Sequence, residues 1–293
     1  MIHALTIDVE DYYSIFARDW LDRPAAPTEA VVRNTHAILE LLASAGGVRS
    51  TCFILGEVVE AYPGLVRDIA SAGHEVGVHG MAHRQFFKLT RDEARQEVGR
   101  AKALIEDTLG ASVAGHRAPA FSIRPDTAWA LEVLAELGFR YDSSVFPIAG
   151  GRYGWPGFPD RIHRMDLPGG LEIVEAPMST VRLLGRTLPA CGGGYLRHFP
   201  YAFTRWAMRR VGRDRAAMVY LHPYELDTQP GPDWLEPELA SADKRTRRFH
   251  RLQLRNRGTV RPKLERMLGD FVFAPLNEVI DAEPASAPSA RNA

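Results

Sequence analysis

The chain has 293 residues, of which 45% are hydrophobic, and this fits one large α/β domain or two small ones. Its 36 Lys and Arg residues balance its 36 Asp and Glu residues, which excludes a global positive field that would attract nucleic acid. The 2 cysteines are too few for a disulfide framework.

No apolar run approaches the roughly 18 residues of a membrane-spanning helix, and a strand-like segment begins almost at the first residue. We therefore expect neither a transmembrane helix nor a signal peptide. These features predict a cytoplasmic protein.

The first predicted strand is the apolar run 4–9, which ends in a cluster of acids. Because side chains alternate along a strand, Asp8 and Glu10 share one face and form a carboxylate pair, whereas Asp11 lies in the loop beyond. A cluster of helix-capping acids is the alternative interpretation.

Helices and strands then alternate along the chain. Apolar residues at helical spacing followed by Gly46 and Gly47 predict a helix over 28–45, and Thr90 with Glu93 forms a capping box that opens a long helix. Further helices are predicted over 63–72, 125–137, 201–211 and 262–268, and further strands over 50–55, 75–78, 114–117, from 140, and over 171–176, 217–221 and 271–273.

Two histidines, His79 and His83, come directly after the strand 75–78. A spacing of four residues brings two side chains together if the segment turns helically, and Gly77 and Gly80 favour such a turn. Two imidazoles and one carboxylate would complete a three-ligand site for zinc or a similar ion. On the pair alone, one packed and one surface histidine is an equally good interpretation.

The alternation of strands and helices predicts parallel strands in a barrel or an open sheet, where catalytic groups gather at the C-terminal strand ends. The candidate site residues all lie at such strand ends, and this agreement favours the metal interpretation of the two histidines. They are Asp8, Glu10, His79, Arg117, Asp142 and His222.

Two segments interrupt the alternation. Between residues 147 and 200 it weakens into Gly, Pro and aromatic residues, and we expect an irregular functional insertion there. A helical extension begins near residue 225, so we expect one domain over 1–283 and a disordered tail over 284–293.

The segment from Lys244 to Arg261 holds eight Lys and Arg residues and no acid. A solvated helix face is one interpretation. The other is peripheral contact with an anionic membrane, at its inner face, or with a lipid-linked glycan, because each cation near an anionic surface contributes about 1 kcal/mol.

These motifs resemble the polysaccharide deacetylase family, carbohydrate esterase family four, across roughly residues 2–224. The sequences DVEDYY, RAPAFSI and YDSSVFP and the glycine run before Tyr195 resemble the subgroup found with exopolysaccharide biosynthesis genes. The resemblance implies a distorted (β/α)7 barrel and a divalent metal, most simply Zn²⁺.

The family motifs also imply roles for individual residues. The HxxxH motif implies that His79 and His83 bind metal, and the opening acidic motif implies that Asp8 is the catalytic base. The arginine-proline motif implies that Arg117 contacts this base, and the Leu-x-His motif, offset by one residue, implies that His222 protonates the departing amine.

The sequence departs from the family pattern at two places. Many members have adjacent aspartates, whereas Val9 follows Asp8 here, so the metal role passes to Glu10, with Asp11 as the alternative. The tryptophan motif is missing, which leaves Asp142 as the residue expected to orient His222.

The expected reaction is hydrolysis of an N-acetyl group on a glycan, with a backbone N–H of Ala120 or Phe121 stabilising the developing oxyanion. Tyr13, Trp155 and Tyr195 are candidates for stacking on sugar rings. The alternatives are a metal amidohydrolase acting on a small non-peptide amide and an inactive carbohydrate-binding relative. A non-haem iron oxygenase uses similar ligands, but the chain shows no further oxidative-cofactor feature.

Overall fold

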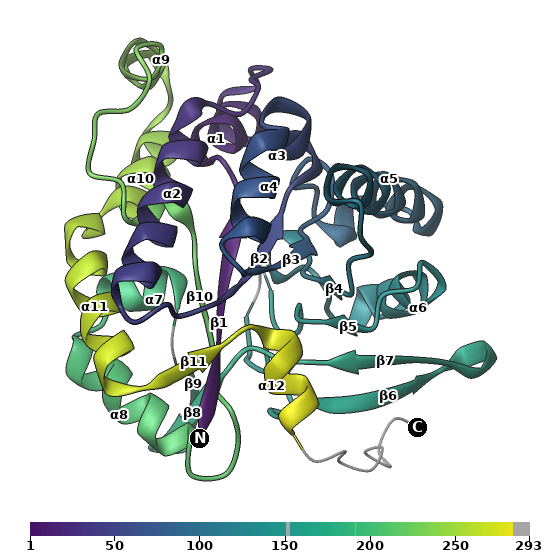
Figure 1. The fold of residues 1–293 in the computed structure, drawn as a ribbon. Helices are drawn as coiled ribbons and strands as arrows, with labels where there is room; N and C mark the ends of the chain where they lie inside the picture. Colours follow the sequence, from purple (N-terminus) through teal and green to yellow (C-terminus); the bar gives the residue numbers. More distant parts are fainter. Residues whose placement is uncertain (151–152, 191, 284–293) are drawn as a thin grey trace.

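The computed structural model describes residues 1–150, 153–190 and 192–283. Its main sheet has the strand order β10-β1-β2-β3-β4-β5-β7-β6, and β11 also pairs with β1 (Figure 1). A separate hairpin joins β8 (Thr180–Leu183) and β9 (Arg186–Pro189). The strands of the main sheet are β1 (Ile2–Val9), β2 (Thr51–Ile54), β3 (Glu75–Val78), β4 (Gly115–His116), β5 (Tyr141–Asp142), β6 (His163–Leu167), β7 (Leu171–Glu175), β10 (Met218–Leu221) and β11 (Val272–Ala274).

Seven strands, from β10 through β1 to β5 and β7, pair in parallel, as the alternation predicted. Their register aligns Val9 with Ile54, Ile54 with Val78, and Val78 with His116, so their C-terminal ends meet at one edge. Beyond β7, Ser179 Oγ accepts a 2.6 Å hydrogen bond from the backbone N–H of Met218, which links the two ends of the parallel order.

Helices surround these strands (Figure 1). The predicted capping box is confirmed at the start of α5, where Glu93 N–H donates to Thr90 Oγ1 and Thr90 N–H donates to the Glu93 carboxylate. The helices are α1 (Tyr12–Leu21), α2 (Glu29–Ser44), α3 (Gly56–Ala61), α4 (Pro63–Ser71), α5 (Arg91–Leu109), α6 (Trp129–Glu136), α7 (Gly193–His198), α8 (Tyr201–Val211), α9 (Leu235–Ser241), α10 (Lys244–Leu254), α11 (Val260–Asp270) and α12 (Leu276–Ala282).

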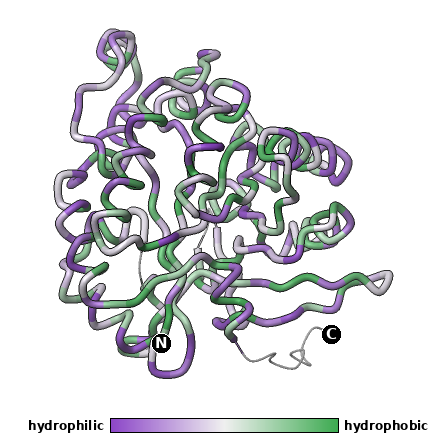
Figure 2. The backbone as a smooth tube through the Cα atoms, in the orientation of Figure 1, coloured by the Kyte–Doolittle hydropathy of each residue, from purple (hydrophilic) through white to green (hydrophobic). Residues whose placement is uncertain are grey.

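The core lies along the central strands. Every residue of β2 and β10 is buried, as is every residue of β1 after Ile2, because elements cover both faces of these parallel strands. Figure 2 shows hydrophilic residues on the outward turns of peripheral helices such as α5. No helix in the described ranges is both long and apolar enough to cross a bilayer.

The region 147–200 is more regular than predicted. Strand β7 belongs to the parallel order beside β5, and β6 and β7 form an antiparallel hairpin. Exposed and buried residues are mixed within β6 and β8, so these strands lack the continuous apolar runs on which the sequence prediction relied. Cys191 and the predicted tail 284–293 lie outside the described residues.

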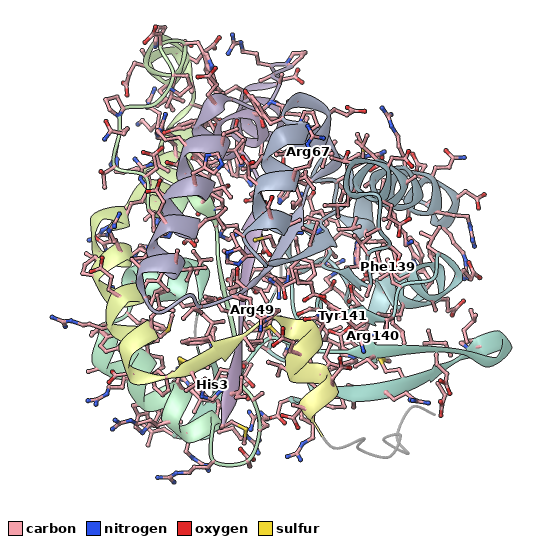
Figure 3. All side chains as sticks on the ribbon, in the orientation of Figure 1. His3, Arg49, Arg67, Phe139, Arg140 and Tyr141 are labelled. Atoms are coloured by element: carbon pink, nitrogen blue, oxygen red, sulfur yellow. The ribbon has the colours of Figure 1, made fainter. Side chains whose placement is uncertain are left out.

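His3 predicts a loss of stability in acid. This histidine is buried at the start of β1 (Figure 3), and its Nδ1 accepts a 3.0 Å hydrogen bond from the N–H of Ala217. Burial lowers the pKa of His3 from 6.5 to about 4. In the unfolded chain His3 therefore binds a proton near pH 6.5, whereas in the folded chain it binds one only near pH 4. The free energy of unfolding consequently falls as the pH drops from 6.5 towards 4.

Between pH 7 and pH 5, His3 alone should reduce the free energy of unfolding by about 2 kcal/mol. Urea denaturation of the wild type and of His3→Asn measures this, since Asn keeps an acceptor near the Nδ1 position but does not titrate. The His3→Asn protein should lose less stability over this pH interval. Equal losses in both proteins would contradict the prediction.

Candidate active site

The C-terminal strand ends surround a cavity of about 580 Å³. It brings together residues that are far apart in the chain, namely Asp8, Glu10, His79, His83 and His222. Asp8 is in β1, Glu10 follows β1, and His79 and His222 follow β3 and β10, so the parallel register itself collects them.

Glu10, His79 and His83 form a buried cluster whose ligand atoms all lie within 4.8 Å of one another. Glu10 Oε2 is 3.1 Å from His83 Nε2 and 3.5 Å from His79 Nε2. His79 Nδ1 donates to the carbonyl of Arg117 at 2.9 Å, because a carbonyl can only accept. This bond leaves Nε2 of the neutral ring unprotonated and directed at Glu10.

The prediction of a helical turn between the two histidines is wrong. Residues 79–85 form an irregular bend in which Gly80 and His83 both have left-handed backbone conformations, with φ of +83° and +56°. Pro119 lies 3.3 Å from where a Cβ of Gly80 would be, so a larger side chain would be crowded as well as strained. The bend brings the two imidazole centroids to 5.8 Å.

These three residues fit a divalent metal. Within the described residues, Glu10 Oε2 and His83 Nδ1 are buried and have no hydrogen-bond partner, and an ion beside Glu10 would compensate its oxygen. Burial opposes the charged form of Glu10, yet the charges of His83 and His222 hold the pKa of this carboxyl well below its usual value. Two histidines and one glutamate are a donor set of catalytic zinc sites.

Arg117 holds Asp8 in place. Its Nη1 donates to Asp8 Oδ1 at 2.8 Å and to Thr6 Oγ1 at 2.6 Å. Its Nε and Nη2 donate to the carbonyl and hydroxyl of Ser143, and the guanidinium lies 4.4 Å from the ring centroid of Phe53. Because Arg117 is fully buried, it contacts the predicted base but not the cavity.

His222 lies between carboxylates. Its Nδ1 is 3.1 Å from Glu225 Oε2, and its Nε2 is 3.8 Å from both Asp8 Oδ2 and Glu10 Oε1. Burial disfavours the charged ring, but Glu10, Glu225 and Asp8 outweigh it and raise the pKa of His222 from 6.5 to about 9. A protonated ring donates Nδ1–H to Glu225 and has a second proton on Nε2 at the cavity.

Asp142 does not orient His222, which corrects the sequence prediction. Asp142 Oδ1 accepts hydrogen bonds from His116 Nδ1 and Ser144 Oγ, both at 2.7 Å, and β5 is not a neighbour of β10 in the strand order. Glu225 takes this place through a tight turn three residues after His222.

Glu225 is itself held by Arg197. The Arg197 Nε donates to Glu225 Oε1 at 2.7 Å, and both side chains are buried. The only sequence signal that Glu225 would contact His222 is its position three residues after this histidine, across Pro223.

Asp11 serves as the N-cap of α1. Its carboxylate accepts from the N–H of Ser14 and from the N–H and hydroxyl of Thr28. The structure therefore places Glu10, and not Asp11, beside the two histidines.

Ala120 and Phe121, the predicted oxyanion donors, both line the cavity and both have positive φ values of +53° and +52°. The N–H of Phe121 already donates to the carbonyl of Ala118 at 3.1 Å. Ala120 is therefore the better candidate of the two.

The predicted sugar-stacking residues separate into two groups. Tyr195 lines the cavity, where its hydroxyl is 2.6 Å from that of Tyr153. Tyr13 is buried in another apolar cluster, and Trp155 packs on Phe158. Several further lining residues were not predicted as part of the site, namely Tyr153, Tyr220, Tyr224, Phe249 and Leu252.

Residues 22–141 match the family model described as "Polysaccharide deacetylase", and residues 143–281 match one described as "Domain of unknown function (DUF3473)". The peptidoglycan deacetylase of Helicobacter pylori is 31% identical over 96 residues, which are 33% of this chain and 32% of that protein. The peptidoglycan-N-acetylglucosamine deacetylase of Bacillus cereus is 35% identical over 63 residues, 22% of this chain and 23% of that protein. The matches thus span about a third or less of these relatives.

The fold is that of the polysaccharide deacetylases. A Mycobacterium smegmatis structure assigned to them superposes with a TM-score of 0.62 at 18% identity, covering 99% of this chain and 94% of that one. A pseudoenzyme of carbohydrate esterase family four from Bacillus anthracis gives 0.50 at 14% identity, covering 96% and 65%. The sequence matches thus make this chain similar to polysaccharide and peptidoglycan deacetylases over part of its length, and the two solved structures show the fold.

Proposed function

We propose that this protein is a zinc-dependent hydrolase that removes N-acetyl groups from a sugar of a polysaccharide or of its lipid-linked precursor. The observation that carries the proposal is one cavity in which the Glu10, His79 and His83 cluster lies beside Asp8 and His222. The sequence motifs shared with the exopolysaccharide-associated subgroup favour an exopolysaccharide as the polymer.

Glu10, His79 and His83 would hold the metal, which when bound polarises an amide carbonyl and lowers the pKa of water. Asp8 uses Oδ1 to accept from Arg117, so Oδ2 is the oxygen that takes the proton of the attacking water. The Ala120 N–H donates to the oxyanion, and His222 donates its Nε2 proton to the departing amine nitrogen.

The intact site argues against an inactive carbohydrate-binding relative, because the predicted base, acid and ligands are all present at the cavity. Tyr153, Tyr195 and Tyr220 in the lining favour a sugar over a small non-peptide amide, since aromatic side chains offer flat apolar faces to sugar rings.

We also propose that the basic segment 244–261 meets the anionic carrier of a lipid-linked substrate in the cytoplasm. Helix α10 borders the cavity through Phe249 and Leu252. Its Phe249 stacks on Trp20 at 3.9 Å between centroids, so this aromatic side chain faces the protein and not a bilayer. None of the segment's Lys or Arg residues lines the cavity, so its cations would meet a phosphate attached to the bound sugar outside the cavity.

Acetate release tests the proposed reaction. We expect the purified protein to release acetate from N-acetylated oligosaccharides, to lose this activity after chelation and to recover it with zinc. His79→Ala is the matched control, because it should have no zinc-restored activity. Acetate release by the chelated protein, or hydrolysis of small amides in preference to every glycan tried, would contradict the proposal.

A further inference from the structure

The β8–β9 hairpin and helix α8 expose large apolar side chains at the protein surface. Leu184, at the hairpin turn, is 94% exposed, Leu183 is 38% exposed, and Trp206 of α8 is 39% exposed. These are three of the seven large hydrophobic residues that the described ranges leave exposed. The other four are Met1, Ile2, Leu252 and Val272, which lie in other segments.

The two segments form one continuous surface. Arg182 of β8 and Arg210 of α8 line the same small cavity, and Arg215 Nη2 donates to the carbonyl of Thr180 at 3.0 Å. Figure 1 shows α8, β8 and β9 beside one another near the N-terminus. We name this surface the hairpin face and define it by Arg182, Leu183, Leu184, Arg186, Trp206, Arg209, Arg210 and Arg213.

The hairpin face carries uncompensated positive charge. None of its five arginines forms an ion pair with a carboxylate of the described residues. The nearby acids are already paired, Asp270 with Arg205 at 3.0 Å and Asp160 with Arg215 at 2.8 Å. In a chain of zero net charge, this is a local excess of five cations around three exposed apolar side chains.

The backbone at the hairpin tip supports a role for the leucine. Leu184 has φ of +49° and is followed by Gly185 with φ of +75°. A left-handed backbone is unfavourable for leucine, and glycine or asparagine would adopt it at lower cost. The turn thus holds an almost wholly exposed leucine at a position where glycine or asparagine would cost less.

We propose that the hairpin face docks on an anionic lipid bilayer. The two leucines would enter the acyl boundary, Trp206 suits the interfacial region, and the arginines would pair with lipid phosphates. A nucleic acid or a polyanionic glycan would use the arginines but would leave the leucines in water. The hairpin starts near the N-terminal end of β10, whereas the cavity lies at the C-terminal strand ends. Docking therefore leaves the cavity open to a free polysaccharide and favours it, among the proposed substrates, over a precursor anchored in the same bilayer.

Vesicle co-sedimentation tests this proposal without using the proposed activity. At low salt, the full chain should sediment with vesicles of phosphatidylcholine and phosphatidylglycerol but not with phosphatidylcholine alone. The triple variant Arg209→Glu, Arg210→Glu and Arg213→Glu should bind about 100-fold more weakly or worse. Leu184→Asp, which changes one exposed side chain, should weaken binding about tenfold.

A triple variant on other elements provides the matched control. Arg67→Glu, Lys88→Glu and Arg266→Glu make the same change in net charge at exposed positions outside both the hairpin face and segment 244–261, and they should retain most of the binding. Equal loss in both triple variants would overturn the proposal in favour of general charge attraction. Absence of wild-type binding to the anionic vesicles would also overturn it, and so would arginine-dependent binding that Leu184→Asp leaves unchanged. Thermal unfolding of each variant confirms that it is folded.

Discussion

Asp8→Asn is expected to keep zinc and lose acetate release by about 10² to 10⁴-fold, because an amide cannot take the proton of the attacking water. The ligand cluster of Glu10, His79 and His83 does not include Asp8. Elemental analysis of the purified variant, together with initial rates of acetate release, measures both parts of this expectation.

The fold should survive this change because the Asn oxygen can still accept from Arg117, which now donates to Asp8 Oδ1 at 2.8 Å. Asn thus removes the counter-charge of the fully buried guanidinium but keeps its hydrogen bond, whereas removing the acceptor as well would give the full cost of a broken buried pair, about 3–5 kcal/mol. Glu10→Gln is the paired variant and should lose zinc. If Asp8→Asn were metal-free while Glu10→Gln kept full occupancy, the two roles would have to be exchanged.

The elements that could be predicted from the sequence are those whose apolar pattern reports their burial. Strands β1, β2 and β10 are apolar runs because they are covered on both faces. Helix α1 was missed because the acidic cluster at its start was assigned to the site, and helix capping, the role that Asp11 has as N-cap of α1, was kept only as the alternative. A capping acid and a ligating acid are the same residue type, so only the fold distinguishes them.

The site was predictable to the level of strand ends and no further. Parallel strands bring their C-terminal ends together, which is why Glu10, His79 and His222 could be placed in one cavity. The choice of Glu225 over Asp142 depends on a tight turn and on the order of strands around the sheet. Neither property appears in apolar periodicity, and the left-handed bend at His83 does not either.

His222→Ala should reduce acetate release by about 10² to 10⁴-fold with little change in zinc content, because the ring is assigned to the leaving amine and not to the metal. The ring is partly exposed to the cavity, so its truncation should leave the fold intact. Initial rates and elemental analysis measure this, and wild-type activity in His222→Ala would show that the histidine is only structural.

Glu225→Gln tests whether Glu225 is the positioning residue of the proposed general acid, His222. Gln keeps an acceptor for the Nδ1–H of His222 but removes one of the three negative charges, those of Glu10, Glu225 and Asp8, that together raise the pKa of this ring to about 9. A lower pKa means that His222 loses its proton at lower pH, so the basic limb of the rate profile should move to lower pH while KM changes little. Asp142→Asn is the control, because Asp142 bonds His116 and should leave this limb in place. If Asp142→Asn moved the limb and Glu225→Gln did not, the pairing of His222 with Glu225 would have no part in catalysis.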